Sequence, residues 1–204
     1  MTLKVHHLNA SRSQRIVWLL EELGTPHEVV HYTRNTETNL APPELLNLHP
    51  MGKSPLLEHD GVVIAETGAI AEYLLAKFDS DHKLHPRSDS PDFPRYLEWL
   101  HAGEGAIFLP GLMGFYLMGA GLAEHELAAK MGEEAVKAAG TIEAHLSKHA
   151  YFAGETFSAA DCLMGFQIGS MKATGRLPGG SATEAWLDKV QARPAFQRTL
   201  AVGI

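Results

Sequence analysis

The stretch Gly52–Ile70 reads GKSPLLEHDGVVIAETGAI and decides how the first part of the chain folds. Two short apolar runs, PLLE and VVIA, flank the dipeptide Asp60-Gly61, which is a strong signal for a tight hairpin turn. At Glu66-Thr67 the second run gives way to apolar residues at helical spacing. The stretch therefore predicts a β-hairpin followed at once by a helix over 67–78.

The residues upstream predict a β-α-β unit. LKVHHL at 3–8 is a strand candidate, and HEVVHYT at 27–33 alternates like a second strand. Between them lies an amphipathic helical pattern that stops at Gly24, and Ser11 followed by Gln14 fits a capping box at its start. A crossover helix of this kind favours a parallel strand pair.

With a short helix near 43–48, the order β-α-β, α, β-β-α predicts a thioredoxin-like α/β domain over 1–80. Residues 81–90 are polar and charged and predict a linker. From 91 to 204 strand signals almost vanish, which predicts an all-α domain. Its expected helices cover about 92–119, 122–149, 158–173 and 183–201.

FSAAD, with Ser158 and Asp161 three residues apart, predicts a capping box at the third of these helices. Cys162 then lies in the first turn of the helix and is expected to be packed rather than reactive. As the one cysteine of the chain it excludes an intramolecular disulfide and a C-x-x-C site.

The composition of the chain argues against nucleic acid, a membrane or a metal as its partner. The 204 residues carry a formal charge of −7 without a basic block, so nucleic acid is not expected as a partner. No apolar run is long enough to span a bilayer, and the N-terminus lacks a signal-peptide pattern, so a cytoplasmic protein is expected. The twelve histidines show no metal-ligand spacing, and no metal is expected.

The order of the short motifs resembles the glutathione S-transferase superfamily over the whole chain. The motifs are SRSQR after the first strand, GKSP before the hairpin, AET at the helix after it, and FSAAD in the second half. The forms LKVHHLNASRSQRIVWLLEELG and APPELLNLHPMGKSPLLE look most like bacterial and fungal members with a catalytic serine. The resemblance implies a glutathione-binding first domain and a homodimer.

The resemblance also implies how the opening stretch binds glutathione. Pro55 would be cis, so that the Ser54 backbone pairs with the cysteinyl part of glutathione like an added strand. Glu66 would meet the γ-glutamyl ammonium, and Thr67 at a helix start would bind its carboxylate. Lys53 either pairs with the glycyl carboxylate or is a solvated surface lysine.

Ser11 matches the family's catalytic serine, four residues before Arg15, and would donate a hydrogen bond to the glutathione thiolate. The thiolate is the nucleophile, and a hydrogen bond to a charged acceptor, worth about 1.5–3 kcal/mol, is large enough to favour it. Ser13 and Asn9 remain alternatives for this role.

An electrophile pocket is expected between the two halves, lined by the first helix of the second domain. Its candidate residues are Tyr96, Phe108, Met113, Phe115 and Tyr116, of which Phe108, Met113 and Tyr116 are preferred. Glu104 either reaches a glutathione ammonium across a dimer interface or is a solvated acid.

The predicted function is therefore a glutathione transferase, with glutathione as co-substrate and a detoxifying attack on small hydrophobic electrophiles. Two alternatives remain. One is a non-catalytic glutathione-fold binding or regulatory protein. The other is a glutathione-dependent peroxidase, isomerase or reductase on the same fold, since a fold does not settle a substrate.

Overall fold

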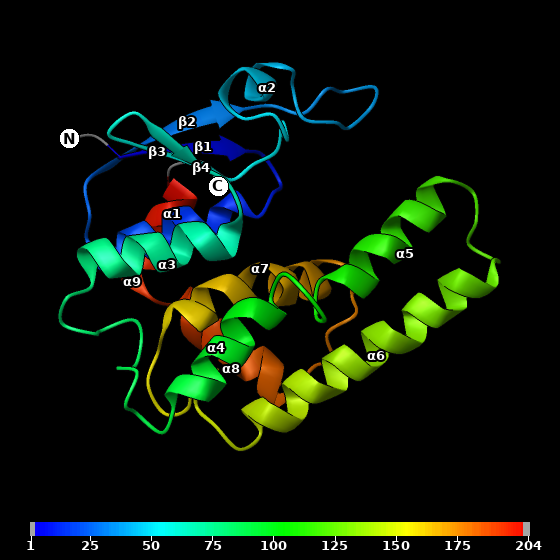
Figure 1. The fold of residues 1–204 in the computed structure, drawn as a ribbon. Helices are drawn as coiled ribbons and strands as arrows, with labels where there is room; N and C mark the ends of the chain where they lie inside the picture. The colour runs from blue at the N-terminus through cyan, green and yellow to red at the C-terminus, as the bar shows by residue number, and fades with distance from the viewer. Residues whose placement is uncertain (1–2, 202–204) are drawn as a thin grey trace. The chain divides into compact units, whose positions relative to one another are not determined.

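A computed structural model describes residues 3–201 (Figure 1). The chain divides into two compact units, residues 1–85 with 190–204 and residues 86–189, and each is described by itself. The domain limits 1–80, 81–90 and 91–204 remain a prediction.

The first unit is built on a four-stranded sheet in the order β2-β1-β3-β4. Strands β1 (Leu3–Leu8) and β2 (His27–Tyr32) pair in parallel, with Leu3 opposite His27. Strand β3 (Leu56–His59) runs antiparallel to β1 and forms a hairpin with β4 (Val62–Ile64). The β-α-β unit and the hairpin predicted from the sequence are both confirmed.

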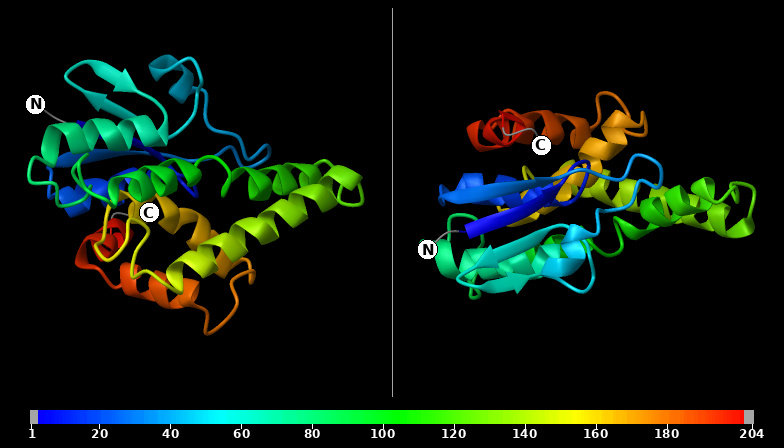
Figure 2. Two further views of the ribbon diagram at one scale, coloured as in Figure 1. Left: turned by 60° about the horizontal axis from the view of Figure 1, so that its bottom comes forward. Right: turned by 90° about the horizontal axis from the view of Figure 1, so that it is seen from above.

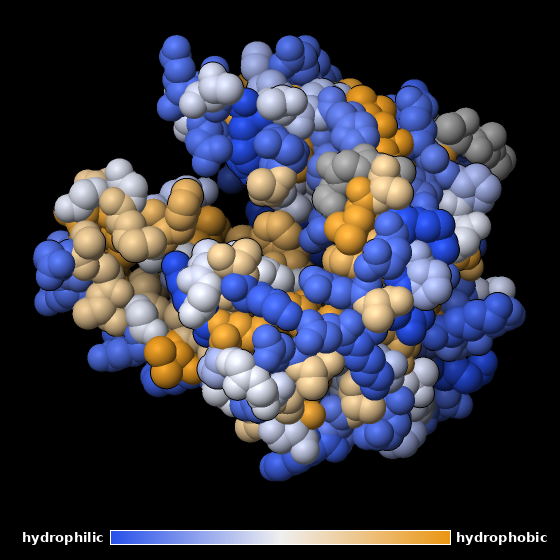
Figure 3. Space-filling view, turned by 180° about the vertical axis from the view of Figure 1, so that it is seen from behind, coloured by the Kyte–Doolittle hydropathy of each residue, from blue (hydrophilic) through white to orange (hydrophobic). Residues whose placement is uncertain are grey.

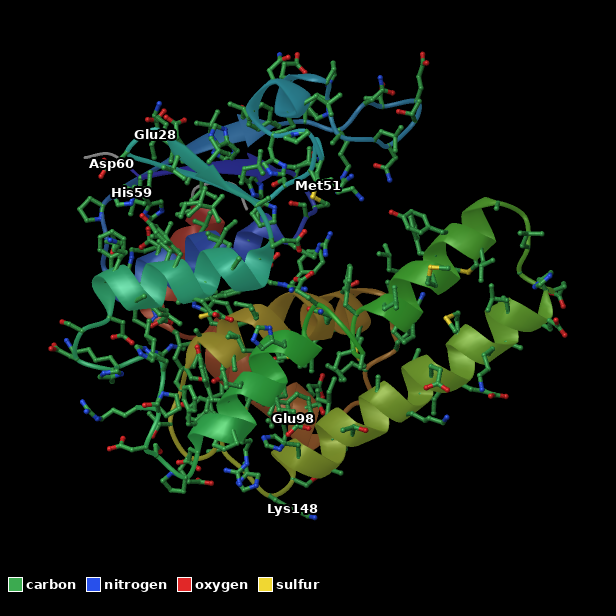
Figure 4. All side chains as sticks on the ribbon, viewed as in Figure 1. Glu28, Met51, His59, Asp60, Glu98 and Lys148 are labelled. Carbon is green, nitrogen blue, oxygen red and sulfur yellow. The ribbon has the colours of Figure 1, made fainter. Side chains whose placement is uncertain are left out.

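The hairpin turn has the geometry that its sequence demands. Asp60 has φ 51° and Gly61 has φ 80°, so both central residues have the positive φ of a type I′ turn. Figure 4 labels Asp60 beside His59 at this end of the sheet. The turn brings the chain back across the sheet and delivers it to helix α3.

Two helices, α1 (Ser13–Leu23) and α3 (Thr67–Phe78), lie on one side of the sheet, and the short α2 (Glu44–Leu48) lies near its opposite side (Figure 1). The last helix, α9 (Pro194–Ala201), packs on α1, where the Trp18 and Phe196 rings meet edge to face at 5.0 Å. Arg193 adds a two-pronged ion pair to Glu22, at 2.6 and 2.7 Å.

The predicted helix over 183–201 is wrong as a single element. Helix α8 (Ala182–Gln191) ends before Pro194, and α9 begins there, because proline has no N–H to donate and its ring clashes with the preceding turn. The break lets the last helix join the first unit, whereas the sequence pattern predicts it as part of the helical domain.

The second unit is helical. Its long first pattern is split into α4 (Phe93–Ala102) and α5 (Leu109–Gly119), followed by α6 (Glu126–Leu146) and α7 (Ala159–Ala173). The views in Figures 1 and 2 agree in placing α5 and α6 side by side. The core gathers aromatic rings around Phe152, which lies 4.8 Å from the Trp99 ring and 4.9 Å from the Trp186 ring.

Asp161 fixes the start of α7. The predicted capping box with Ser158 is present, and the same carboxylate accepts from the Phe152 N–H at 3.1 Å and from Trp186 Nε1 at 3.0 Å. Cys162 is buried and forms no disulfide, as expected of a packed residue. Helices α5 and α6 and the turn between them, by contrast, expose large apolar or aromatic side chains, which are Leu109, Phe115, Tyr116, Met118, Leu122, Leu127 and Val136. Figure 3 shows one face of the molecule, on which hydrophobic residues in orange lie among hydrophilic ones in blue.

Candidate glutathione site

Ser11 lies in the loop between β1 and α1. The helix begins at Ser13, and Arg12 occupies the N-cap position without a side-chain cap bond. The predicted capping box of Ser11 and Gln14 is therefore wrong: the Ser11 Oγ accepts from the Ser13 N–H at 3.3 Å, only two residues along. Ser11 thus stands just ahead of the helix, where free N–H groups and the helix dipole favour a negative charge.

The two serines form a chain of hydrogen bonds with a histidine of β1. The Ser11 and Ser13 hydroxyl oxygens are 2.6 Å apart, and Ser13 Oγ is 2.8 Å from His7 Nδ1. Ser13 is fully buried, whereas Ser11 keeps 8% of its surface exposed. Of the two hydroxyls, only that of Ser11 belongs to a residue with exposed surface.

Asn9, an alternative to Ser11 as the donor to the sulfur, is hydrogen-bonded to Arg34. Its Oδ1 accepts from the Arg34 N–H at 2.9 Å, and the Arg34 guanidinium donates to the Asn9 and Ala10 carbonyls at 3.1 and 3.2 Å. Ala10 has φ 49°, a conformation that a residue with a Cβ adopts only under local strain. Arg34 therefore clamps the loop that presents Ser11, a role that no motif in the sequence signals.

His7 was not singled out from the sequence. Burial, together with the neighbouring His31, lowers the pKa of His7 to about 4, so its ring is neutral at pH 7. The two adjacent histidines serve opposite faces of the strand, because His6 lies near Tyr32 and Glu58 instead. Only the contact with Ser13 distinguishes His7 from an ordinary buried histidine.

The Ser54-Pro55 peptide bond is cis, as the family resemblance implies. The Ser54 hydroxyl donates to the His6 carbonyl at 2.8 Å and accepts from the Leu8 N–H at 3.2 Å. Since its one hydroxyl proton is used inside the protein, the side chain of Ser54 anchors the loop to β1. The backbone is the part of Ser54 that is suited to hold a ligand.

Leu8 connects this loop to the serine pair. Its N–H donates to Ser54, and its carbonyl is 3.5 Å from the Ser13 hydroxyl, so the main chain at the end of β1 touches both groups. Lys53 and Met51, in the loop before Ser54, are exposed, and Figure 4 labels Met51. Within residues 3–201, no hydrogen bond or ion pair holds the Lys53 ammonium, so a contact with the glycyl carboxylate and a solvated lysine both remain predictions.

Glu66 and Thr67 mark the start of α3. Glu66 is the N-cap residue with φ 71° and has no side-chain cap bond, while Thr67 is the first helical residue and is only 3% exposed. A positive φ at a glutamate is strained by about 1–3 kcal/mol, a cost that such residues typically carry at functional sites. The positive φ of Glu66 changes the direction of the main chain at the start of α3, and the Glu66 side chain is exposed to solvent.

The candidate residues for the electrophile all lie in the second unit. Phe108 is the N-cap of α5 and contacts the Phe166 ring at 6.5 Å, Met113 is half-buried, and Tyr116 is 57% exposed. Tyr96 is buried in the core of the unit and is a packing residue. Glu104 follows α4 and is half-buried.

Two observations concern the rest of the chain. A groove of about 540 Å³ lies at the opposite end of α1, lined by residues such as Gly24, His27 and Arg198, and contains none of the predicted site residues. Within residues 3–201, no helix is both long and apolar enough to cross a membrane, and no three His, Cys, Asp or Glu side chains gather as metal ligands.

Comparison with known proteins identifies the family of the chain. Residues 1–76 match the family model described as glutathione S-transferase, N-terminal domain. Glutathione S-transferase 3 of Schizosaccharomyces pombe is 33% identical over 178 residues, covering 80% of this chain and 72% of the relative.

Two solved structures extend the likeness to nearly the whole chain. A glutathione S-transferase from Actinobacillus pleuropneumoniae superposes with a TM-score of 0.88 at 27% identity, covering 98% of this chain and 92% of the other. A sphingomonad glutathione S-transferase complexed with glutathione has a TM-score of 0.81 at 23% identity, covering 98% of both chains. By sequence and by fold, the chain belongs to the glutathione S-transferase superfamily.

Proposed function

We propose that the chain is a glutathione transferase in which Ser11 stabilises the glutathione thiolate for attack on a small hydrophobic electrophile. Family membership supports the general class, an enzyme of the glutathione transferase type. The observation that carries the finer proposal is that Ser11, the outer and 8% exposed end of the hydroxyl chain, stands just ahead of α1. Its hydroxyl is thereby available to a sulfur at the end of β1.

The chemistry requires the thiol of glutathione to ionise near neutral pH. A thiol is a poor nucleophile until it ionises, and each pKa unit requires about 1.36 kcal/mol of preferential stabilisation of the thiolate. One hydroxyl donor to a charged acceptor supplies roughly 1.5–3 kcal/mol. The amino end of α1 adds a further favourable contribution because its dipole is positive there.

Binding of the tripeptide would use the backbone around the cis peptide bond and the start of α3. The Ser54 N–H and C=O would pair with the cysteinyl part, in the manner of an added strand. The Thr67 hydroxyl and the free N–H groups of α3 would hold the γ-glutamyl carboxylate, and Glu66 its ammonium. Lys53 would pair with the glycyl carboxylate. The sphingomonad relative, whose structure is complexed with glutathione, supports glutathione as the co-substrate.

The electrophile would lie against Phe108, Met113 and Tyr116, and we further propose a cytoplasmic homodimer with a role in detoxification. These exposed or half-buried apolar side chains on α5 match a small apolar substrate. The domains proposed for these roles are 1–80 for glutathione and 91–204 for the electrophile, joined by 81–90.

The test is a calorimetric titration with glutathione, followed by a conjugation assay with a small aromatic electrophile. Binding at or below millimolar concentration together with conjugation supports the proposal. Binding without turnover would favour the non-catalytic alternative. An absence of binding at millimolar glutathione would refute the proposed site altogether.

A further inference from the structure

Three side chains of the first unit form one continuous hydrogen-bond chain that runs from the interior to the surface. His7 of β1 is 2% exposed, Ser13 at the start of α1 is fully buried, and Ser11 is 8% exposed. The links are 2.8 Å from His7 Nδ1 to Ser13 Oγ and 2.6 Å from Ser13 Oγ to Ser11 Oγ. The chain therefore has a buried end at the imidazole and an outer end at the hydroxyl proposed to meet the sulfur.

The number of protons limits how this chain can be arranged. Each hydroxyl carries one proton, and each link of the chain consumes one. If the His7 proton is on Nε2, Ser13 must donate to Nδ1 and Ser11 must donate to Ser13. Ser11 then has no proton left for a sulfur.

The other arrangement leaves the Ser11 proton free. With the proton on Nδ1, His7 donates to Ser13, and the Ser13 proton can go to the Ser11 oxygen at 2.6 Å or to the Leu8 carbonyl at 3.5 Å. The much shorter distance favours donation to Ser11. The Ser11 oxygen already accepts from the Ser13 N–H at 3.3 Å, and one lone pair remains for the Ser13 hydroxyl. The Ser11 O–H can then point outward toward an acceptor.

We infer that His7 is a positioning residue, which carries its ring proton on Nδ1 and thereby directs the hydroxyl protons of Ser13 and Ser11 toward the glutathione sulfur. This inference rests on the proposed function and assigns a direction to the same site. A bound thiolate favours this direction, because it supplies a charged acceptor at the outer end of the chain. Successive hydrogen bonds also polarise one another, so the inner two links strengthen the outer one.

The state of the imidazole is consistent with this role. Burial and the His31 ring, whose centroid is 5.4 Å away, keep the pKa of His7 at about 4. The ring is therefore neutral at working pH and carries a single proton, so the position of that proton is a definite property of the site. Tautomer and orientation of a histidine are set by the partner of each ring nitrogen.

The direct test is nitrogen NMR of the imidazole in the wild-type complex with glutathione. The chemical shifts and proton couplings of the two ring nitrogens distinguish Nδ1–H from Nε2–H, and the signal missing in His7→Gln assigns His7. The expected result is a proton on Nδ1. A proton on Nε2 in a complex that binds glutathione overturns this inference and with it the role of Ser11 as the donor to the sulfur, while glutathione binding itself stands. A chain that binds no glutathione overturns the proposed site altogether.

A second test measures the pKa of the bound thiol from its thiolate absorbance in a double-mutant cycle. His7→Phe is expected to raise this pKa by up to about 0.7 units, because cooperative strengthening is at most about 30% of a charge-assisted bond worth up to about 3 kcal/mol. In a Ser13→Ala background the same change is expected to have no further effect, because the chain is already broken. An equal shift in both backgrounds, or none in either, overturns the inference.

The cycle has a matched pair of controls. His7→Asn places an amide N–H where Nδ1 lies, and His7→Gln places it where Nε2 lies. We expect Asn, but not Gln, to keep the thiol pKa within about 0.2 units of wild type, since only Asn supplies the donor that Ser13 needs. The reverse order would contradict the assignment of the proton.

Discussion

The Ser54 hydroxyl donates a hydrogen bond of 2.8 Å to the main-chain carbonyl of His6, and so ties the cis peptide bond to the central strand. The same oxygen accepts from the Leu8 N–H, so a single buried hydroxyl satisfies two backbone groups of β1. These bonds fix the position of the Ser54 backbone beside the loop of Ser11.

Ser54→Ala should therefore destabilise the fold and weaken glutathione binding together. The substitution leaves the buried His6 carbonyl and the buried Leu8 N–H without their hydrogen-bond partner. Each of these groups that gains no water in its place lowers the free energy of unfolding by about 1–3 kcal/mol. We expect the free energy of unfolding in urea to fall by about 2 kcal/mol. Ser147→Ala is the control, because the Ser147 hydroxyl also donates to a backbone carbonyl but is exposed. A loss below that of Ser147→Ala would contradict this role.

Thr67→Ala should separate binding from stability. Thr67→Ala removes no helix cap, because Glu66 is the N-cap of α3, and the loss of a buried methyl group should lower the free energy of unfolding by about 1 kcal/mol. Loss of a hydrogen bond to a carboxylate should weaken glutathione binding roughly 10- to 100-fold. Thr67→Ser keeps the hydroxyl and should bind like wild type. Unchanged affinity in Thr67→Ala, measured by calorimetry, would remove Thr67 from the site.

His7 should make stability depend on pH in a defined direction. Its pKa is about 4 in the folded protein and near the ordinary 6.5 when unfolded, so the unfolded state binds the proton more tightly. The contribution of His7 to stability is present above about pH 6.5 and is lost as the pH falls toward 4. The full change is about 3 kcal/mol.

The measurement is the free energy of unfolding of wild type minus that of His7→Gln, from pH 4 to 7. The difference is needed because burial raises the pKa of Asp161 to about 6, which gives wild type and variant alike an opposite trend in the same window. A flat difference for His7 would contradict its burial as a neutral ring.

Asp161→Asn should be far more damaging than Ser158→Ala. The carboxylate accepts from the Phe152 N–H, the Ser158 N–H and hydroxyl, and Trp186 Nε1, whereas an amide would turn an N–H₂ toward some of these donors. We expect a loss above about 3 kcal/mol, against about 0.5–2 kcal/mol for the lost cap in Ser158→Ala. Similar losses in urea unfolding would show that Asp161 is only a helix cap.

Local signals in the sequence predicted much of this fold. Asp60-Gly61 specified the hairpin because only a few residues tolerate positive φ at both positions, and Ser158 with Asp161 specified the start of α7. The docking of α9 on α1 was missed, because the contact between Trp18 and Phe196 joins distant parts of the sequence. Pro194 marked the helix break that makes this docking possible, but the amphipathic pattern on either side concealed it.

The candidate site was also predictable only in part, because some of its contacts join distant parts of the sequence. Ser11, Ser54 and Thr67 lie in short motifs, whereas the capping box expected of Ser11 failed because the Ser13 N–H takes its oxygen instead. The roles of His7 and Arg34 depend on contacts across the fold, to Ser13 and to the carbonyls of Asn9 and Ala10. No spacing in the sequence encodes these contacts.

The most direct test of the central claim is the pH titration of thiolate absorbance in the glutathione complexes of wild type, Ser11→Ala and Ser13→Ala. If Ser11 donates to the sulfur, Ser11→Ala should still bind glutathione, and its bound thiol should titrate about one to two pKa units higher. The rate of conjugation at neutral pH should fall by about tenfold for each unit by which the pKa rises. The fall is partly offset because a more basic thiolate is a stronger nucleophile. Ser13→Ala should shift the pKa by less. An unshifted pKa in Ser11→Ala, or a larger shift in Ser13→Ala, would contradict the assignment of Ser11.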